Sequence, residues 1–481
     1  MIESRAQRYS VFSIFVILCF WAVSACGQAA GPAPSVTPQV DERVELLSIV
    51  WRLAGSPEYN MDTLPSYSQD IDRYFAPYRN YPAVQMARTL ERTRGVSYDA
   101  VMAMAVSLSP PPGLHPLVPF SDSVPEPRWG MQGSDEFLPL LRDFYRDSKF
   151  EDFYREHSAF YQLAESRFAA TLGEVDFGWY PQFYGEAPNL TYHLILGMNN
   201  GGGNYGPRLI HPDGRMELFS IVGCWTHDGK DNPTYPENQR FLTAIIHEFN
   251  HSFVNPAVDT QWRDFTGADA VYGAVAEALR QIAYGDARTM VNESLVRAAV
   301  IIYFKEHGED AGANLRRVRR EQALGFFWMD SLVDLLQKYE AQRDKYPTFT
   351  SFLPRVVEFY QRLAPRATQE YALYQSHGAH VANMKPFTNH EQDVDPAVSV
   401  ITIVLDKPLD PKAGYSIGAA AGSGATSPIA GTPTFAAGGL QVELPVHLEP
   451  RRRYAFLLTP LAFATPDGYP LALYEVDFAT K

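Results

Sequence analysis

The segment TAIIHEFNHSFVNP, residues 243–256, places two histidines and a glutamate behind a run of apolar residues. On a helix, positions four apart lie on nearly the same face, so His247 and His251 can both point their imidazoles at one cation, with Glu248 beside them. Apolar side chains flank the motif on most sides, which predicts a buried helix. Buried polar side chains each cost about 1–3 kcal/mol without partners. A bound Zn²⁺ would supply a partner to several of them at once.

A zinc site that performs hydrolysis needs three protein ligands and one open position for water. Two glutamates on later helical stretches can supply the third ligand: Glu277 in VAEALRQIAYG and Glu293 in VNESLVRAAVIIYF. Each also has a purely structural explanation. Glu293 lies four residues before Arg297, the spacing that favours an ion pair on a helix surface, and Glu277 lies three residues before Arg280. The spacing leaves both glutamates open as ligands.

With zinc in place, His247 and His251 would bind as neutral imidazoles, and zinc would lower the pKa of a bound water to about 7. Glu248 would take the proton as general base and later pass it to the leaving amine. Such enzymes often hold a peptide substrate as an added strand on a sheet edge. GGGNYG, residues 201–206, is a candidate edge in which Asn204 and Tyr205 would contact substrate. The alternative is a strand-to-strand loop that makes no such contact.

Two rival functions use the same residues. Zinc hydrolysis of an amide or ester outside peptides needs no change in the ligand set. A surface-anchored binding protein with a structural metal is the other, and it requires a fourth protein ligand that closes the site, such as His227 or Asp259.

The N-terminal residues 1–26 are typical of an export signal, because Arg5 and Arg8 precede an apolar stretch that ends in small residues. Its last four residues, Val-Ser-Ala-Cys, resemble the bacterial lipobox, which implies a lipid on Cys26 and anchorage at the cell envelope, facing the periplasm or the exterior. An ordinary secretory signal cut near Ala25 or Ala30 is the alternative. The mature chain would then contain a single cysteine, Cys224, and no intramolecular disulfide.

Composition supports a folded body and narrows the partners. The chain has 481 residues, 46% of them hydrophobic and 20% charged, with a net charge of −14 and no long basic run. That balance argues against nucleic acid or an anionic membrane surface as the main partner, and the acidity itself names no partner. The partners expected from the zinc motif and the lipobox are a peptide or protein substrate and, through the lipid anchor, the membrane. Residues 27–40 are rich in Pro, Ala and Gly and are expected to form a flexible tether.

The sequence predicts an α+β fold in which a mainly helical domain with a small sheet, residues 41–390, precedes an all-β unit, residues 395–481. DERVELLSIVWRLAG, residues 41–55, has helical periodicity and ends at Gly55, and one long helix is expected from a cap at Ser134 to about residue 173. LTYHLILG and RMELFSIVG are expected to be neighbouring strands. Asn255 before Pro256 predicts the end of the motif helix.

Two resemblances add to this reading. LEPRRRY and the closing VDFAT resemble the corner and last strand of fibronectin and bacterial immunoglobulin-like modules. From Arg43 to Pro386, the segments GGGNYG, HEFNHSFVNP and NESLVRA are similar to a bacterial group catalogued as a domain of unknown function, 4932, with gluzincin-like motifs. The Asn-Glu pair of NESLVRA resembles the second gluzincin motif, which favours Glu293 over Glu277 as the third zinc ligand. The resemblance implies an envelope zinc metallopeptidase without an assigned substrate.

Overall fold

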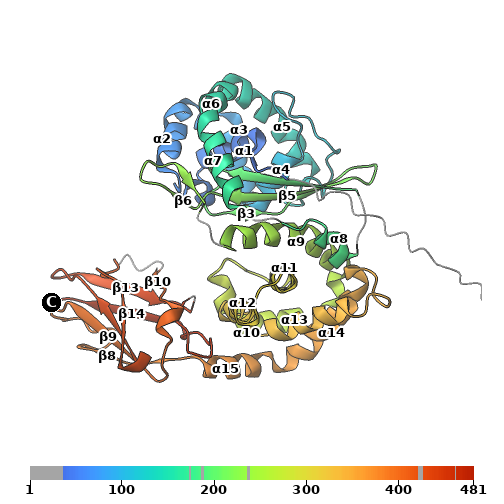
Figure 1. Ribbon diagram of the computed structural model, residues 1–481. Coiled ribbons are helices and arrows are strands. Elements are labelled where there is room, and N and C mark those ends of the chain that lie inside the picture. The colour runs from blue at the N-terminus through green and yellow to red at the C-terminus, as the bar shows by residue number, and fades with distance from the viewer. Residues whose placement is uncertain (1–35, 173–174, 186–188, 236–238, 421–425, 461) are drawn as a thin grey trace, which may run out of the picture.

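The computed structural model describes residues 36–172, 175–185, 189–235, 239–420, 426–460 and 462–481. The predicted signal segment and Cys26 lie outside these residues. The fold is α+β: helices dominate up to residue 377, and a β-rich unit follows (Figure 1). Among the described residues, no helix is both long enough and apolar enough to cross a membrane.

A mixed sheet lies at the centre of the helical part. Its strands are β1 Gln39–Val40, β2 Leu190–Gly197, β5 Met216–Gly223, β3 Asn204–Tyr205 and β4 Arg208–Ile210. The expected neighbours β2 and β5 pair in parallel along their whole length, whereas β3 and β4 pair with β5 antiparallel and form one edge. β1 pairs with β2 on the other side, so Gln39 and Val40, which lie in the expected tether, form an edge strand.

The N-terminal helices pack together on one side of the sheet (Figure 1). They are α1 Glu42–Ala54, α2 Pro65–Tyr74, α3 Pro82–Arg94, α4 Asp99–Val106, α5 Gly130–Asp147, α6 Phe150–Glu156 and α7 Ser158–Thr171. The next helix, α8 Trp179–Tyr184, lies on the other side of the sheet beside α9 (Figure 1). α1 ends at Gly55 as predicted, with that glycine at φ 95°, and the Asp41 side chain caps its start by accepting from Arg43 N. The single long helix expected from Ser134 is wrong. Left-handed Lys149 and non-helical His157 divide it into three helices, and Ser134 lies inside α5, where its hydroxyl donates to Gly130 O.

The second group of helices lies on the other side of the sheet (Figure 1). After the hairpin of β6 Thr226–His227 and β7 Pro233–Thr234 come α9 Gln239–Gln261, α10 Ala268–Arg280, α11 Ala287–Glu306, α12 Ala311–Ala323, α13 Met329–Glu340, α14 Phe349–Leu363 and α15 Ala367–His377. α9 packs between β5 and α11. The predicted end of this helix before Pro256 is wrong, because α9 continues to Gln261.

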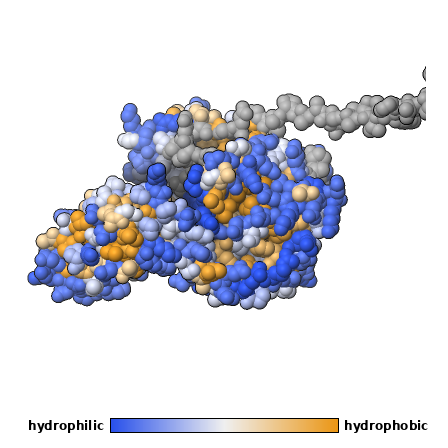
Figure 2. Space-filling view, turned by 60° about the horizontal axis from the view of Figure 1, so that its bottom comes forward, coloured by the Kyte–Doolittle hydropathy of each residue, from blue (hydrophilic) through white to orange (hydrophobic). Residues whose placement is uncertain are grey.

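Two small sheets form the C-terminal unit. One has the order β11 Thr434–Ala436, β12 Gln441–Pro445, β9 Val400–Leu405, β8 Val381–Lys385, and the other β10 Ile417–Ala419, β13 Arg453–Leu458, β14 Tyr474–Ala479. They enclose a hydrophobic core separate from that of the helical part. β8 precedes the expected boundary near residue 395, since its largely exposed residues lack an apolar run. The unit projects from the helical body as a lobe (Figure 2).

Candidate functional site

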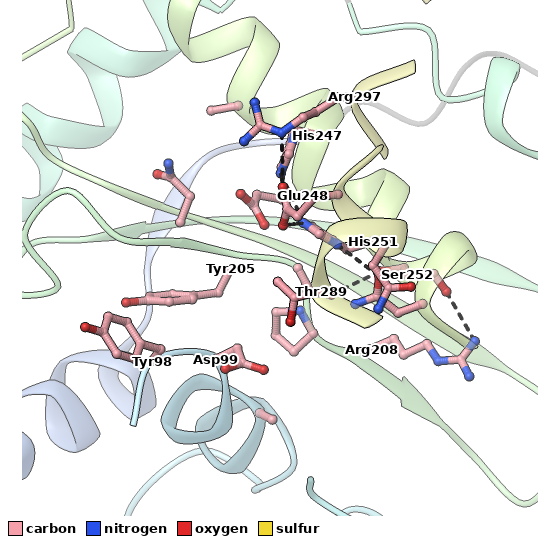
Figure 3. Close-up of a pocket in the computed structure, with 18 of the residues that line it drawn as sticks. Tyr98, Asp99, Tyr205, Arg208, His247, Glu248, His251, Ser252, Thr289 and Arg297 are labelled. Carbon is pink, nitrogen blue, oxygen red and sulfur yellow. Dashed lines mark hydrogen bonds and ion pairs between the residues drawn. The ribbon is translucent and has the colours of Figure 1, made fainter. Parts of the chain in front are cut away.

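α9 holds the histidine motif because its apolar face is buried among aromatic rings. Phe253 stacks on Tyr184 with ring centroids 4.4 Å apart, and Phe249 packs edge-on against Tyr192 at 5.3 Å. Asn250 is also fully buried, and its side-chain oxygen accepts from the Tyr184 hydroxyl at 2.8 Å. Asn250 therefore holds the buried face of α9 in place. His247, Glu248 and His251 lie on the opposite face and line a cleft (Figure 3).

The donor atoms of three residues converge at the cleft wall. His247 Nε2 lies 3.0 Å from His251 Nε2 and 3.5 Å from Glu293 Oε2, and His251 Nε2 lies 3.4 Å from Glu293 Oε1. Ligands about 2.0–2.1 Å from a tetrahedral zinc ion are separated by roughly 3.3 Å. Two imidazole nitrogens and one carboxylate, spaced in this way, fit a zinc ion in both donor type and geometry.

Glu293 comes from α11 and is held by two further residues. The Tyr284 hydroxyl donates to Glu293 Oε2 at 2.8 Å, and Arg297 Nε lies 3.3 Å from the same oxygen. Arg297 also donates to the Tyr284 oxygen at 2.8 Å and to Glu321 Oε2 at 2.5 Å. The ion pair between Glu293 and Arg297 expected from their spacing is present, and the carboxylate faces the histidines at the same time.

Burial and neighbouring charges set the protonation of the site. Burial raises the pKa of Glu293, but His247, His251 and Arg297 outweigh it and hold the pKa well below the usual range. Burial lowers the pKa of His247 to about 3. His251 is buried too, yet its contact with Glu293 raises its pKa to about 9. Burial raises the pKa of Glu248 to about 7. The carboxylate of Glu293 is thus ionised, as a metal ligand must be.

Asn255 orients the second histidine. Its side-chain oxygen lies 3.1 Å from His251 Nδ1, so a hydrogen on that nitrogen fixes the tautomer and leaves Nε2 to face His247 and Glu293. Pro256 follows within the helix and has no N–H for the Ser252 carbonyl four residues earlier. Arg208 Nη1, from β4, donates to that carbonyl at 3.2 Å and replaces the missing hydrogen bond.

The chain just after edge strand β3 lies against α9 at Glu248 of the histidine motif. A Cβ added at Gly206 would lie 2.0 Å from the Glu248 carbonyl oxygen, so only glycine fits there. Asn204 and Tyr205 line the cleft, as the predicted substrate contacts should. Asn204 also has a structural role, since its side-chain oxygen accepts from Gly223 N at 3.2 Å. Their contact with substrate stays a prediction.

The cleft has a volume of about 1950 Å³. Its walls come from both sides of the sheet: α4 and the loop before α5, the edge strands, and α9, α11 and α12. Figure 3 shows Tyr98 and Asp99 across the cleft from the histidines. Sites for small molecules measure roughly 300–1,000 Å³, so this cleft is large enough for part of a polymer.

The other candidate ligands lie away from the histidines. Glu277 is exposed on α10 and does not line the cleft. His227 pairs with Asp231 at 3.2 Å, and Asp259 with Arg288 at 2.9 Å. Within the described ranges, the ligand atoms that gather within 4.8 Å of one another belong to His247, His251 and Glu293. The sequence did not predict that Tyr284, Arg297 and Glu321 form a hydrogen-bonded group that fixes the Glu293 carboxylate. The spacing indicated only the contact of Arg297 with Glu293.

Comparison with solved structures gives weak similarity to a bacterial surface-layer protein, SbsC. Domains 1–6 of SbsC match at 12% identity and a TM-score of 0.17, over 51% of this chain and 34% of that one. Its N-terminal part matches at 11% identity and the same TM-score, over 52% of this chain and 59% of that one. The chain thus spans about a third of the larger SbsC structure.

None of the curated proteins matches this chain. A protein family matches residues 36–359, which include every helix and strand that builds the cleft, and its description is "Domain of unknown function (DUF4932)". Since the match covers more than half of the chain, the protein belongs to the DUF4932 family.

Proposed function

We propose that this protein is an envelope-anchored zinc-dependent hydrolase and, among hydrolases, a metallopeptidase of gluzincin type. The observation that carries the proposal is the triangle of donor atoms from His247, His251 and Glu293, with sides of 3.0, 3.4 and 3.5 Å. The size of the cleft supports a polymeric substrate. The position of the edge strand beside the motif supports binding of a peptide as an added strand.

In this proposal, His247, His251 and Glu293 hold the zinc ion. Zinc supplies Lewis acidity and lowers the pKa of water at the site. Glu248, buried in the cleft next to His247, takes the proton of the attacking water and later delivers it to the leaving amine. Tyr284 and Arg297 fix the Glu293 carboxylate, and Asn255 fixes the His251 ring.

The rival proposal of a binding protein with a structural metal needs a closed set of four ligands. His227 and Asp259 are the candidates, and both are engaged elsewhere in ion pairs. This observation favours the hydrolase. Hydrolysis of a non-peptide amide or ester would use the same residues, and a substrate screen separates it from peptide cleavage.

The proposal extends to the two ends of the chain. Lipidation at Cys26 would anchor the protein at the bacterial cell envelope. We propose an immunoglobulin-like sandwich for the C-terminal unit, because two sheets enclose one core and the Tyr454 hydroxyl accepts from Glu449 N at 2.7 Å. Such a bond from a tyrosine back to the chain a few residues upstream is the corner found in immunoglobulin-type domains.

Elemental analysis of the purified full-length chain tests the metal site. We expect about one zinc per chain in the parent. His251→Ala and Glu293→Ala should lose it, whereas Glu277→Ala should keep it, because Glu277 is exposed outside the cleft. Circular dichroism checks that each variant is folded. A folded parent that takes up no zinc after reconstitution would refute the proposal.

Activity is then measured on a library of quenched fluorescent peptides, with amide and ester substrates alongside. The zinc-loaded parent should cleave peptides. Glu248→Gln should retain zinc and lose at least about 100-fold in rate, since it removes the general base and none of the three ligands. Equal rates for the two proteins would refute the assigned role of Glu248.

A further inference from the structure

The helix α12 contains four arginines within five residues, and they divide into two pairs. Arg317 and Arg319 have structural contacts. Arg317 lies 2.8 Å from Glu309 Oε1 and donates to Thr243 Oγ1 at 3.1 Å. Arg319 donates to Gln322 at 2.7 Å and lies over the Tyr469 ring at 4.2 Å. These two arginines therefore hold α12 against its neighbours.

The other pair, Arg316 and Arg320, is exposed and lines the cleft. In the part of the chain that the structure describes, neither guanidinium makes a hydrogen bond or an ion pair. Arg316 contributes through space to the lowered pKa of Asp310, whose first cause is the hydrogen bond from Ala313 N. Like charges four residues apart weaken a helix slightly, and Arg320 in the last turn of α12 offsets this through the helix dipole, so helix stability does not explain Arg316.

The remaining charges of the cleft are largely balanced. Arg128 pairs with Asp99 and Glu126, and Arg288 with Asp259. Glu309 pairs with Arg317, and Glu321 pairs with Arg297. Glu293 is one of the three candidate zinc ligands. Glu248 alone among the carboxylates of the cleft wall has no arginine partner within the described residues. Arg316 and Arg320 on the α12 wall of the cleft are thus available to bind an anionic ligand, although the chain as a whole carries a net charge of −14.

We propose that Arg316 and Arg320 form an anion-binding subsite that selects substrates carrying a carboxylate. The inference rests on the proposed hydrolase and names its substrate class, an acidic peptide. Two guanidinium groups from residues one helical turn apart can each give charge-assisted hydrogen bonds to carboxylates. The carboxylate comes either from an aspartate or glutamate side chain or from the C-terminus of a peptide.

The subsite is linked by direct contacts to the helices that carry the candidate zinc ligands His247, His251 and Glu293. Glu321, the residue after Arg320, binds Arg297, which in turn contacts Glu293. Arg317, the residue after Arg316, binds Thr243, one helical turn before His247 on α9. A peptide in the cleft can therefore reach both the subsite and the zinc ligands, and binding energy at the arginines can orient the bond to be cleaved.

The test measures binding, which does not depend on turnover. Fluorescence anisotropy follows a fluorescein-labelled Ala-Glu octapeptide and a matched Ala-Gln octapeptide on the full-length, zinc-loaded Glu248→Gln protein. Each peptide is made with a free and with an amidated C-terminus, which separates side-chain carboxylates from the terminal one. We expect the acidic peptide to bind at least about tenfold more tightly than the neutral one. The preference should shrink as salt increases.

Arg316→Gln with Arg320→Gln should abolish that preference and leave the Kd of the neutral peptide within about twofold. Arg280→Gln is the matched control, because Arg280 is exposed on α10 outside the cleft. Equal weakening of both peptides, no weakening, or no preference in the parent would overturn the inference. Cleavage of peptides without acidic preference would refute the subsite alone. Acidic preference in a protein that takes up no zinc would refute the hydrolase alone.

Discussion

His251 Nδ1 lies 3.1 Å from the side-chain oxygen of Asn255, one turn further along α9. This contact fixes the imidazole so that its other nitrogen faces His247 and Glu293. Losing a partner of this kind commonly costs 10- to 100-fold in metal affinity. We expect Asn255→Ala to raise the zinc dissociation constant by roughly that factor, measured by competition with a chromogenic chelator.

Thr260→Ala, on the same helix, is the control for Asn255→Ala. Its hydroxyl donates only to Ala257 O, at 2.7 Å, and the substitution should leave zinc affinity unchanged. Unaltered affinity in folded Asn255→Ala would contradict the orienting role.

Arg297 balances two carboxylates in a largely buried position. It lies 3.3 Å from Glu293 and 2.5 Å from Glu321. Arg297→Met leaves both carboxylates without this cation and should lower the free energy of unfolding by roughly 3–5 kcal/mol. Adding Glu321→Leu should recover part of that loss. Urea denaturation of the single and double variants checks this, and a double variant no more stable than the single one would argue against charge as the cause.

Arg208 and Pro256 should be energetically coupled through the Ser252 carbonyl. Pro256→Ala restores the N–H that this carbonyl lacks in α9. Removal of Arg208, whose Nη1 lies 3.2 Å from Ser252 O, should therefore cost about 1–3 kcal/mol in the parent and less in Pro256→Ala. A double-mutant cycle with Arg208→Met measures the difference. Strict additivity of the two substitutions would rule out the compensation.

Glu45 should make stability depend on pH. Its carboxylate is fully buried and accepts from Met198 N and from the Tyr67 hydroxyl, both at 2.8 Å. Burial raises the pKa of Glu45 from 4.5 to about 7. Between these values the folded chain keeps a proton that the unfolded chain releases, so the contribution to stability is complete below pH 4.5 and is lost as the pH rises to about 7.

Glu45→Gln should make the urea midpoint of the protein less dependent on pH across that range, and the contribution of Glu248, whose pKa is also raised to about 7, should remain. The exposed Glu277→Gln serves as the control and should keep the slope of the parent. A Glu45→Gln variant with the parental pH dependence would assign the slope to another group.

Short sequence patterns predicted correctly those helices and strands whose ends or faces depend only on neighbouring residues. Gly55 marked the end of α1 because the left-handed conformation at a helix end favours glycine, which the sequence itself shows. The alternation in β2 and the apolar run of β5 likewise identified a strand pair. The left-handed conformation of Lys149 carries no such signal, since residues other than glycine rarely adopt it, and the break after α5 was missed.

Long-range contacts account for the other differences. Pro256 predicts a helix end only if nothing else satisfies Ser252 O, and Arg208 reaches it from 44 residues earlier. Spacing placed His247 and His251 on one face, but it left Glu293 and Glu277 both open. The packing of α11 against α9 decides which glutamate faces the histidines, and no local pattern encodes that packing.

The contact between Arg319 and Tyr469 makes α12 a shared wall between the cleft and the C-terminal lobe. His377, at the end of α15, also stacks on Tyr469, with the two ring centroids 4.9 Å apart. A displacement of the lobe would therefore move a helix whose residues Arg316 and Arg320 line the cleft. The lobe thus contacts the helical body through α12 and α15, and of these two helices α12 also lines the cleft.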